Sequence, residues 1–371
     1  MSLNDLFTLT FQYPWLFVTM ILVLGILFVN GWSDAPNAIS TCISTKAMKI
    51  KPALIMTGIL NFVGLLIMFY ISTGVAQTIQ DMISFTGSYT DFNLTYEQSF
   101  VALKILSASM LAVIIFGVLA SLVGIPSSQT HSLVGGLVGA GLGGVVMGKK
   151  DILINFGMAF EDPLGKVFYG LVLSCAFGFI AGFLTTKLIQ LICKNMNRNH
   201  TRKFFKWSQI FGGASLALVH GAQDGMQFVG IFFIVVQIAA RLGGFKVTSE
   251  FFNASNLWYV GLICAFAIGL GTLCGGKKII KKVAMSMTKL EPYEGFATDL
   301  SSAIGIFIAT YFGFPISTSQ VKAFAILGAG ATKGVRRVKW KTVVEMVVTW
   351  VLTFPGCGLA GFLITCLLLL F

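Results

Sequence analysis

Long apolar segments without charged side chains alternate along the chain with short basic and polar stretches. Residues 53–76 form one such segment of 24 positions. A helix needs about 20 apolar residues to cross the ~30 Å hydrocarbon core of a bilayer, whereas the strands of a membrane barrel alternate in polarity over about ten residues. The pattern therefore predicts an all-α polytopic membrane protein.

The uncharged segment at 105–148 is too long for one crossing. Its 44 residues would extend ~66 Å as a single helix at 1.5 Å per residue, so the chain must double back. Pro126, followed by polar residues at 127–131, marks the tip of this turn, because proline stops a helix. Two full spans with a tight turn are one interpretation. A polar tip favours the other, a re-entrant hairpin that lines a wet cavity.

The second half of the chain repeats the plan of the first. Three short motifs recur in the same order, at offsets of 190, 189 and 189 residues: Gly-Trp-Ser-Asp-Ala-Pro-Asn at 31–37 with Gly-Ala-Gln-Asp-Gly-Met-Gln at 221–227, Pro-Ser-Ser-Gln-Thr-His at 126–131 with Pro-Ile-Ser-Thr-Ser-Gln at 315–320, and Gly-Ala-Gly at 139–141 and 328–330. Such self-similarity indicates a tandem duplication. We expect one repeat at 1–195, with its hairpin around 105–148, and the other at 196–371, with its hairpin around 300–332.

Charge is scarce and unevenly placed. Only 11% of the residues are charged and 56% are hydrophobic, with a net charge of +12, and so few charges do not coat a soluble globule. Nineteen of the 26 Lys and Arg residues fall in four stretches, at 46–51, 187–206, 277–289 and 333–341. Basic clusters between apolar spans mark the cytoplasmic side of a membrane, so they do not indicate a nucleic-acid partner.

If neither hairpin crosses the bilayer, all four basic stretches lie on one side. The N-terminus is then external, and the first repeat begins outside whereas the second begins inside. Inverted repeats of this kind are typical of alternating-access transporters. Lys149 and Lys150 would lie outside and are the exception to this assignment. The Gly-rich run at 135–144 is interpreted as small-residue helix packing.

Two acids lie alone in apolar segments: Asp34 within 6–45 and Asp224 within 207–240. An acid in mid-span costs ~2.5–3.5 kcal/mol on insertion scales, so it should face a cavity or a partner. Helix breaks are expected at both acids, from Gly31 and Pro36 in one motif and from Gly221 and Gly225 in the other. Oxygen ligands there would bind Na⁺, or the acids would carry H⁺; capping or pairing with Lys is the structural alternative. The candidate cation ligands are Asp34, Asp224, Ser33 and Gln223.

The hairpin tips supply donors for an anion. A helix that starts at each tip exposes unpaired N–H groups and the positive end of its dipole. Two opposed tips would hold a tetrahedral oxyanion, and plain N-capping is the alternative. The candidate anion ligands are Asn37, Ser127, Ser128, Thr130, Gln227, Ser317, Thr318 and Ser319. His131, Gln320 and Lys322 are candidates for an anion or proton contact, with an acid partner or the membrane interface as alternatives for Lys322.

In the motifs GWSDAPNA, HGAQDGMQ, PSSQTH and PISTSQ, the chain resembles the inorganic phosphate transporter (PiT) family over essentially its whole length. The resemblance implies secondary active uptake of phosphate by symport with Na⁺ or H⁺, and a homodimer. It also implies that Asp34, Asn37, Asp224 and Gln227 are cation and anion ligands and that the tip hydroxyls cradle phosphate. Ser33, Gln223, Gln227 and Gln320 depart from the family's motifs, which leaves the choice between Na⁺ and H⁺ open.

These patterns together predict a transporter rather than an enzyme, in the plasma membrane, without a resident cofactor. A sulfate permease of the same architecture is the main alternative, and arsenate is a further candidate substrate. An enzyme acting on phosphorylated lipids would not need duplicated tips, and the sequence contains no metal-spaced cluster of His and Asp. A channel is disfavoured because opposed hairpins that close on an anion indicate binding and occlusion.

Overall fold

The computed structural model describes residues 1–85, 94–123, 127–149, 151–245, 254–275, 290–334, 336 and 338–371. Its helices are α1 (Leu3–Gln12), α2 (Pro14–Ser33), the 3₁₀ turn η1 (Ala35–Asn37), α3 (Ser40–Ser44), α4 (Ile50–Ile71), α5 (Gly74–Gln80), α6 (Tyr96–Val123), α7 (Gln129–Val146), α8 (Pro163–Ile192), α9 (Arg198–Leu242), α10 (Trp258–Cys274), α12 (Pro292–Tyr311), α13 (Thr318–Ala331) and α14 (Trp340–Leu370). Two short strands, β1 (Ile83–Ser84) and β2 (Leu153–Ile154), pair antiparallel. Pro126, Lys150 and the basic stretch 277–289 lie outside the described residues.

Within the described part of the chain, six helices are long and apolar enough to cross a membrane: α2 with η1, α4, α6, α8, α9 and α14. The shorter helix α10 is apolar as well. Large apolar side chains such as Leu184, Val351 and Leu363 are exposed on the outer helices, as lipid-facing positions require. The predicted all-α polytopic fold is confirmed.

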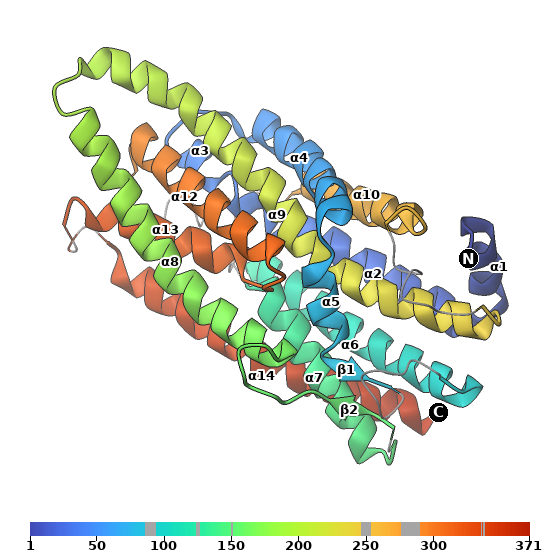
Figure 1. The fold of residues 1–371 in the computed structure, drawn as a ribbon. Helices are drawn as coiled ribbons and strands as arrows, with labels where there is room; N and C mark the ends of the chain where they lie inside the picture. Colours follow the sequence, from blue (N-terminus) through green and yellow to red (C-terminus); the bar gives the residue numbers. More distant parts are fainter. Residues whose placement is uncertain are drawn as a thin grey trace.

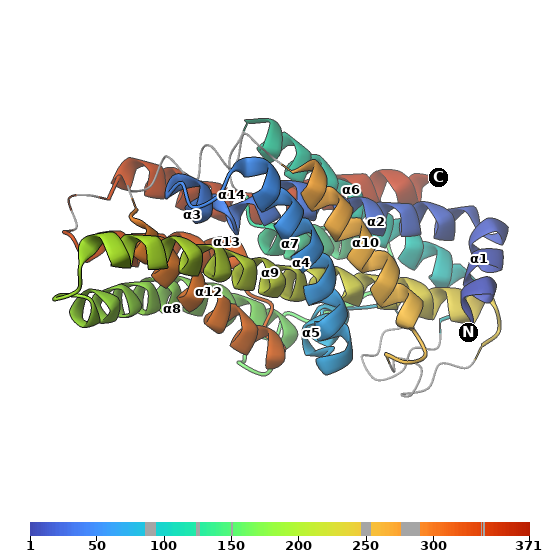
Figure 2. The same cartoon turned by 90° about the horizontal axis from the view of Figure 1, so that it is seen from above.

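Helix α9 forms the centre of the molecule. It has 45 residues and extends from the α8–α9 turn at one end toward α1 at the other (Figures 1 and 2). Of its most apolar 18-residue window, 89% is buried, against 22% for α14 at the outside. Because α9 is enclosed by its neighbours, a polar residue in its middle meets protein and not lipid.

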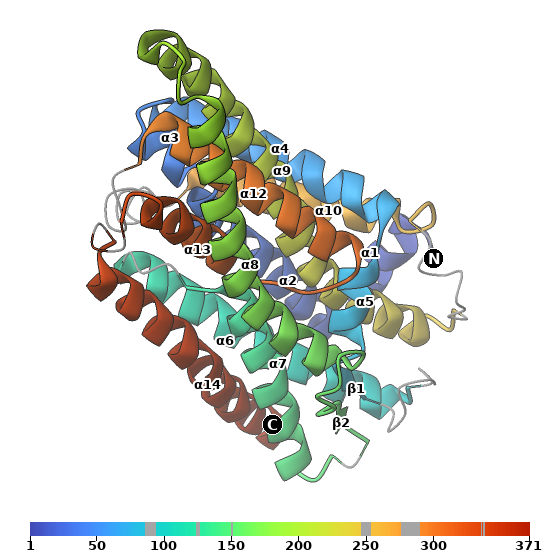
Figure 3. The same ribbon diagram turned by 60° about the vertical axis from the view of Figure 1, so that its left-hand side comes forward.

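The helices of the two halves pack in matching pairs. Helix α7 lies against α14 (Figure 3) and α13 lies against α8, while α4 packs on α9 and α10 packs on α2. Glycines permit the close approach, because a Cβ at Gly139 would lie 1.9 Å from the Gly358 carbonyl oxygen and one at Gly182 would lie 2.4 Å from that of Ala325. The interpretation of the Gly-rich run as helix packing is confirmed.

The expected helix break at Asp34 is present, but the prediction of a helix break at Asp224 is wrong. Helix α2 ends at Ser33, and Pro36 lies in η1, whereas α9 continues through 221–227 without interruption. That stretch contains no proline, so its ladder of backbone hydrogen bonds persists. Its glycines serve helix crossing instead: a Cβ at Gly221 would lie 2.2 Å from the carbonyl oxygen of Asn61 in α4.

Two helical hairpins occupy the expected places. Helices α6 and α7 contain the predicted 105–148 hairpin, and α12 and α13 contain the one around 300–332. The predicted division between residues 195 and 196 falls in the turn between α8 and α9, and the division into repeats stays a prediction.

Candidate functional site

The two lone acids meet at the centre of the fold. Ligand atoms of Asp34, His220 and Asp224 lie within 4.8 Å of one another, and all three residues are buried. Asp34 follows the end of α2, while Asp224 lies one turn after His220 in α9. The folded chain thus assembles a His and Asp cluster that sequence spacing does not reveal, because Asp34 comes from the other half.

Asp34 is held by groups that the helix break brings back toward it. The Asn37 amide Nδ2 donates to the Asp34 Oδ1 at 2.6 Å, and the Ser319 hydroxyl donates to the same oxygen. The Asn37 Nδ2 also donates to the Ser319 Oγ at 3.0 Å. The first turn of α13 is therefore joined directly to the first acid.

Asp224 has partners from two other elements, α2 and α13, and from its own helix. Its Oδ2 accepts from the Asn30 Nδ2 at 3.1 Å and from the Thr318 Oγ1 at 3.4 Å, and it lies 3.4 Å from the His220 Nε2. The His220 Nδ1 in turn lies 3.2 Å from the Asn61 Oδ1. Asn30, His220 and Asn61 were not among the predicted ligands. Buried amides in apolar helices were the signal that could have marked the two asparagines.

The hairpin tips touch each other. Ser128 caps α7 and Ser317 caps α13, where their hydroxyls accept from the backbone N–H groups of His131 at 3.3 Å and Gln320 at 3.4 Å. The Ser128 Oγ also donates to the Ser317 Oγ at 3.0 Å. These residues therefore cap their helices and bring two helix N-termini to one point, and their role as anion ligands stays a prediction.

One backbone carbonyl of the second tip collects three side-chain donors. The oxygen of Ile316 accepts from the Thr130 Oγ1 at 3.2 Å and from the Nε2 atoms of Gln223 and Gln227, each at 3.3 Å. The Gln223 Nε2 also donates to the Phe314 carbonyl at 3.1 Å. The two glutamines of the second acid motif thus hold the α12–α13 tip in place.

The other predicted residues divide between the centre and its surroundings. Ser33 accepts from the Gln129 Nε2 at 3.0 Å, and Ser127 and His131 are buried beside the first tip. Gln320 instead accepts from the Ser174 Oγ of α8 at 3.1 Å. Lys322 forms an ion pair with Asp299, an acid not singled out in the sequence. Gln320 and Lys322 therefore have partners apart from the tips.

Several buried oxygen atoms around the acids have no hydrogen-bond partner among the described residues. They are Asp224 Oδ1, Asn30 Oδ1, Asn37 Oδ1 and Gln129 Oε1. Each is an acceptor that cannot donate, and a buried acceptor left unpaired costs ~1–3 kcal/mol. Carboxylate and amide oxygens are the ligands that hard cations prefer, so this set with Asp34 fits a cation such as Na⁺.

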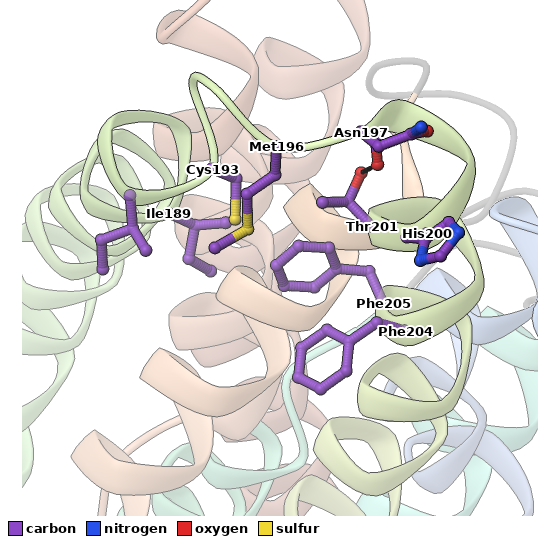
Figure 4. A pocket seen from close by; sticks show the side chains of 9 residues that line it. Ile189, Cys193, Met196, Asn197, His200, Thr201, Phe204 and Phe205 are labelled. Atoms are coloured by element: carbon purple, nitrogen blue, oxygen red, sulfur yellow. Dashed lines mark hydrogen bonds between the residues drawn. The ribbon is translucent and has the colours of Figure 1, made fainter.

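A pocket of about 640 Å³ lies elsewhere, in the α8–α9 turn (Figure 4). Its lining is mostly apolar and includes Ile189, Met196 and Phe204, with His200 at its side. Phe204 precedes Asp224 by twenty residues in α9, which is ~30 Å along the helix. The polar chemistry belongs to the central cluster and not to this pocket.

A family model described as the phosphate transporter family matches residues 30–361. The chain belongs to the phosphate transporter family. The matched range includes every candidate residue named above. Membership confirms the family resemblance of the acid and tip motifs.

Relatives of this phosphate transporter family member align over nearly its whole length. A probable low-affinity inorganic phosphate transporter of Bacillus subtilis (strain 168) is 34% identical over 93% of this chain and 96% of its own length. A probable low-affinity inorganic phosphate transporter of Mycobacterium leprae (strain TN) is 30% identical over 93% of this chain and 76% of its own length. These relatives are named as transporters, so the expectation of a multi-pass transporter rather than an enzyme is confirmed.

A solved structure described as the sodium-dependent phosphate transporter has the same fold. It aligns with 96% of this chain and 100% of its own, with a TM-score of 0.79 and 21% sequence identity.

Proposed function

We propose that the protein is a symporter that moves inorganic phosphate together with Na⁺ or H⁺ across the plasma membrane by alternating access. The observation that carries the proposal is the pair of adjacent hydroxyls at the start of α13. The Ser319 hydroxyl donates to Asp34 and the Thr318 hydroxyl to Asp224. One helix N-terminus, suited to an anion, is thereby bonded to both buried acids, which are suited to cations.

Cations would bind at Asp34 and Asp224. The oxygens of Asn30, Asn37 and Gln129, which have no hydrogen-bond partner in the part of the chain that the structure describes, would complete the coordination, with Ser33 and Gln223 near them. The solved relative described as sodium-dependent supports Na⁺, and H⁺ is the second candidate because a buried acid can carry a proton. Transported cations are substrates here, and no resident cofactor is proposed.

Phosphate would bind between the two tips. Hydroxyls of Ser127, Ser128, Thr130, Ser317, Thr318 and Ser319, with the amides of Asn37 and Gln227, would donate to its oxygens. Replacing the Ser128–Ser317 hydrogen bond with two bonds to phosphate would open the tips around it. His131, buried beside the first tip, is a further candidate donor.

The proposed coupling follows from shared atoms. A cation at Asp34 or Asp224 competes for the carboxylate oxygen that now accepts from Ser319 or Thr318. The released hydroxyl can then donate to phosphate. Cation binding would thus strengthen phosphate binding, and linkage requires the reverse as well.

Alternating access would use two inverted repeats, 1–195 and 196–371. The matching helix pairs, α7 with α14 and α13 with α8, support this division. Helix α13, with 14 residues, is ~21 Å long and falls short of the ~30 Å core, which supports a re-entrant hairpin. An external N-terminus, cytoplasmic basic loops and a homodimer stay predictions.

Uptake of radiolabelled phosphate into proteoliposomes tests the proposal. An inward Na⁺ gradient or an inward H⁺ gradient, imposed separately, should drive phosphate above its equilibrium level. Accumulation under neither gradient would contradict symport. Unlabelled sulfate and arsenate serve as competitors, and sulfate transport without phosphate transport would identify a sulfate permease instead.

A further inference from the structure

A third buried acid lies apart from the central cluster. Asp299 of α12 is fully buried and forms an ion pair with Lys322 of α13, whose side chain is 3% exposed. Its other partners are the Thr41 hydroxyl, which lies 2.8 Å from both carboxylate oxygens, and the Gln209 amide. Helices α3, α9, α12 and α13 therefore meet at this carboxylate.

The ion pair is connected to the central site through α13. Lys322 follows Ser319, the partner of Asp34, by three residues, which is about one helical turn. Gln209 precedes Asp224 by fifteen residues in α9, or ~22 Å along the helix. Asp299 is thus a site apart from Asp34 and Asp224, and its partner Gln209 follows the basic stretch at 187–206 in the sequence.

The surroundings of Asp299 have the composition of a cation site. The Lys322 Nζ donates to the Thr41 Oγ1 at 2.9 Å, and the Gln209 Oε1 is buried without a hydrogen-bond partner among the described residues. Carboxylate, hydroxyl and amide oxygens are the ligands of a hard cation such as Na⁺. In this structure the cation beside the Asp299 and Thr41 oxygens is the ammonium group of Lys322.

We propose that Lys322 is a tethered cation, whose ammonium group takes at Asp299 the place that a cation from solution would take at an unpaired acid. The inference rests on the proposed cation coupling at Asp34 and Asp224. Its consequence is that Asp299 adds no exchangeable cation to the transport cycle, although it is a third buried acid. A buried carboxylate left unpaired is strongly destabilised, so loss of Lys322 should create a demand for one more cation.

Thermal stability of the purified full-length protein tests this without transport. Lys322→Met should melt at a lower temperature than wild type in choline chloride at pH 8. Added NaCl, or a shift to pH 6, should raise its melting temperature by about 5 °C more than that of the wild type. Lys322→Met combined with Asp299→Asn removes both charges and should return the cation dependence to that of wild type.

The control is Lys104→Met, which removes a lysine whose ammonium group lies 5.6 Å from the Trp15 ring. It should leave the cation dependence unchanged. Lys322→Met with the same response to Na⁺ and acid as wild type would overturn the proposal. So would a double variant that keeps the extra response of the single variant, because the response would then not come from Asp299.

Transport gives the second readout. In proteoliposomes, Lys322→Met should raise the Hill coefficient for the coupling cation by about one, and the double variant should restore it; an unchanged coefficient in an active Lys322→Met variant would overturn the proposal. A wild type without cation-driven uptake would refute the proposed function. The stability comparison would still decide whether Asp299 takes up a cation when Lys322 is absent.

Discussion

The two acid motifs have the same spacing but different backbones. Asp34 follows the end of a helix, and Asn37, three residues later, folds back to donate to it. Asp224 lies inside a continuous helix, and Gln227, at the matching position, reaches the Ile316 carbonyl instead. A helix break is therefore not what brings an acid to the centre, because an unbroken helix does so as well.

The two acids also differ in whether their own motif supplies a partner. Asp34 has a partner within its own motif, whereas Asp224 accepts from Asn30 of the first half and from Thr318. Helix α13 donates a hydroxyl to each acid, while Gln129 and Thr130 of α7 donate to Ser33 and Ile316. Two halves with one sequence plan thus have unequal roles, and α13 is the element that joins both acids.

Exchanging the backbone features of the two motifs should have the largest effect. Met226 occupies the position that matches Pro36. Met226→Pro would remove a hydrogen bond from the middle of α9 and clash with the preceding turn, at a cost of ~3 kcal/mol or more. We expect loss of the monodisperse peak in size-exclusion chromatography, or a melting temperature lower by roughly 6 °C or more.

Pro36→Ala is the matched control. It relieves a constraint at a position where the helix has already ended, so stability should change by no more than about 1 kcal/mol. A Met226→Pro protein that melts with the wild type would show that α9 tolerates a break at its acid. Either acid motif would then tolerate a helix break, and the continuous backbone at Asp224 would not be required.

The central position of a residue could be predicted from the sequence where a polar or charged residue stands alone in an apolar segment. Asp34 and Asp224 are single charges in apolar segments, and the polar tips interrupt uncharged stretches, so the cost of burial marks them. The glycines near Asp224 were ambiguous because glycine both breaks helices and permits close crossings. Only the neighbour of Gly221, the Asn61 carbonyl in α4, decides between the two.

Long-range partners could not be predicted either, because a residue's role there depends on which distant helix packs against it. Lys322 had three candidate environments, and its partner Asp299 lies 23 residues earlier in another helix. Nothing in the spacing distinguishes a buried ion pair from a lysine that extends to the interface. Asn30 and Asn61 likewise acquire their roles from helices that meet only in the folded chain.

Neutralising the acids should have the next largest effect. Asp34→Asn and Asp224→Asn are isosteric and keep an oxygen for the donors around them, so both proteins should fold. Each should reduce gradient-driven phosphate accumulation by about 5- to 150-fold, the range of coupling between linked sites. Proteoliposome uptake under the gradient that drives the wild type measures this, with equal protein incorporation checked by immunoblot. Wild-type accumulation by either variant would remove that acid from the coupling site and leave the other as its one acidic cation ligand.

The smallest effect is expected from removing either of the two hydroxyls at the start of α13. Comparing the two variants tests whether the bond to Asp34 matters more than the bond to Asp224. The Ser319 hydroxyl donates to Asp34, whereas the bond from Thr318 to Asp224 is 3.4 Å long, which exceeds the usual length of a hydroxyl hydrogen bond and makes it weak. Ser319→Ala should raise the phosphate concentration for half-maximal uptake by about 3- to 10-fold, as expected for the loss of one hydrogen bond to phosphate, and Thr318→Val should raise it less. Ser132→Ala is the control, because its hydroxyl donates to the Ser128 carbonyl at 3.1 Å and, among the described residues, to neither acid. If Thr318→Val had the larger effect, the acid in the continuous helix would be the one through which α13 responds to cations, and the break at Asp34 would matter for structure alone.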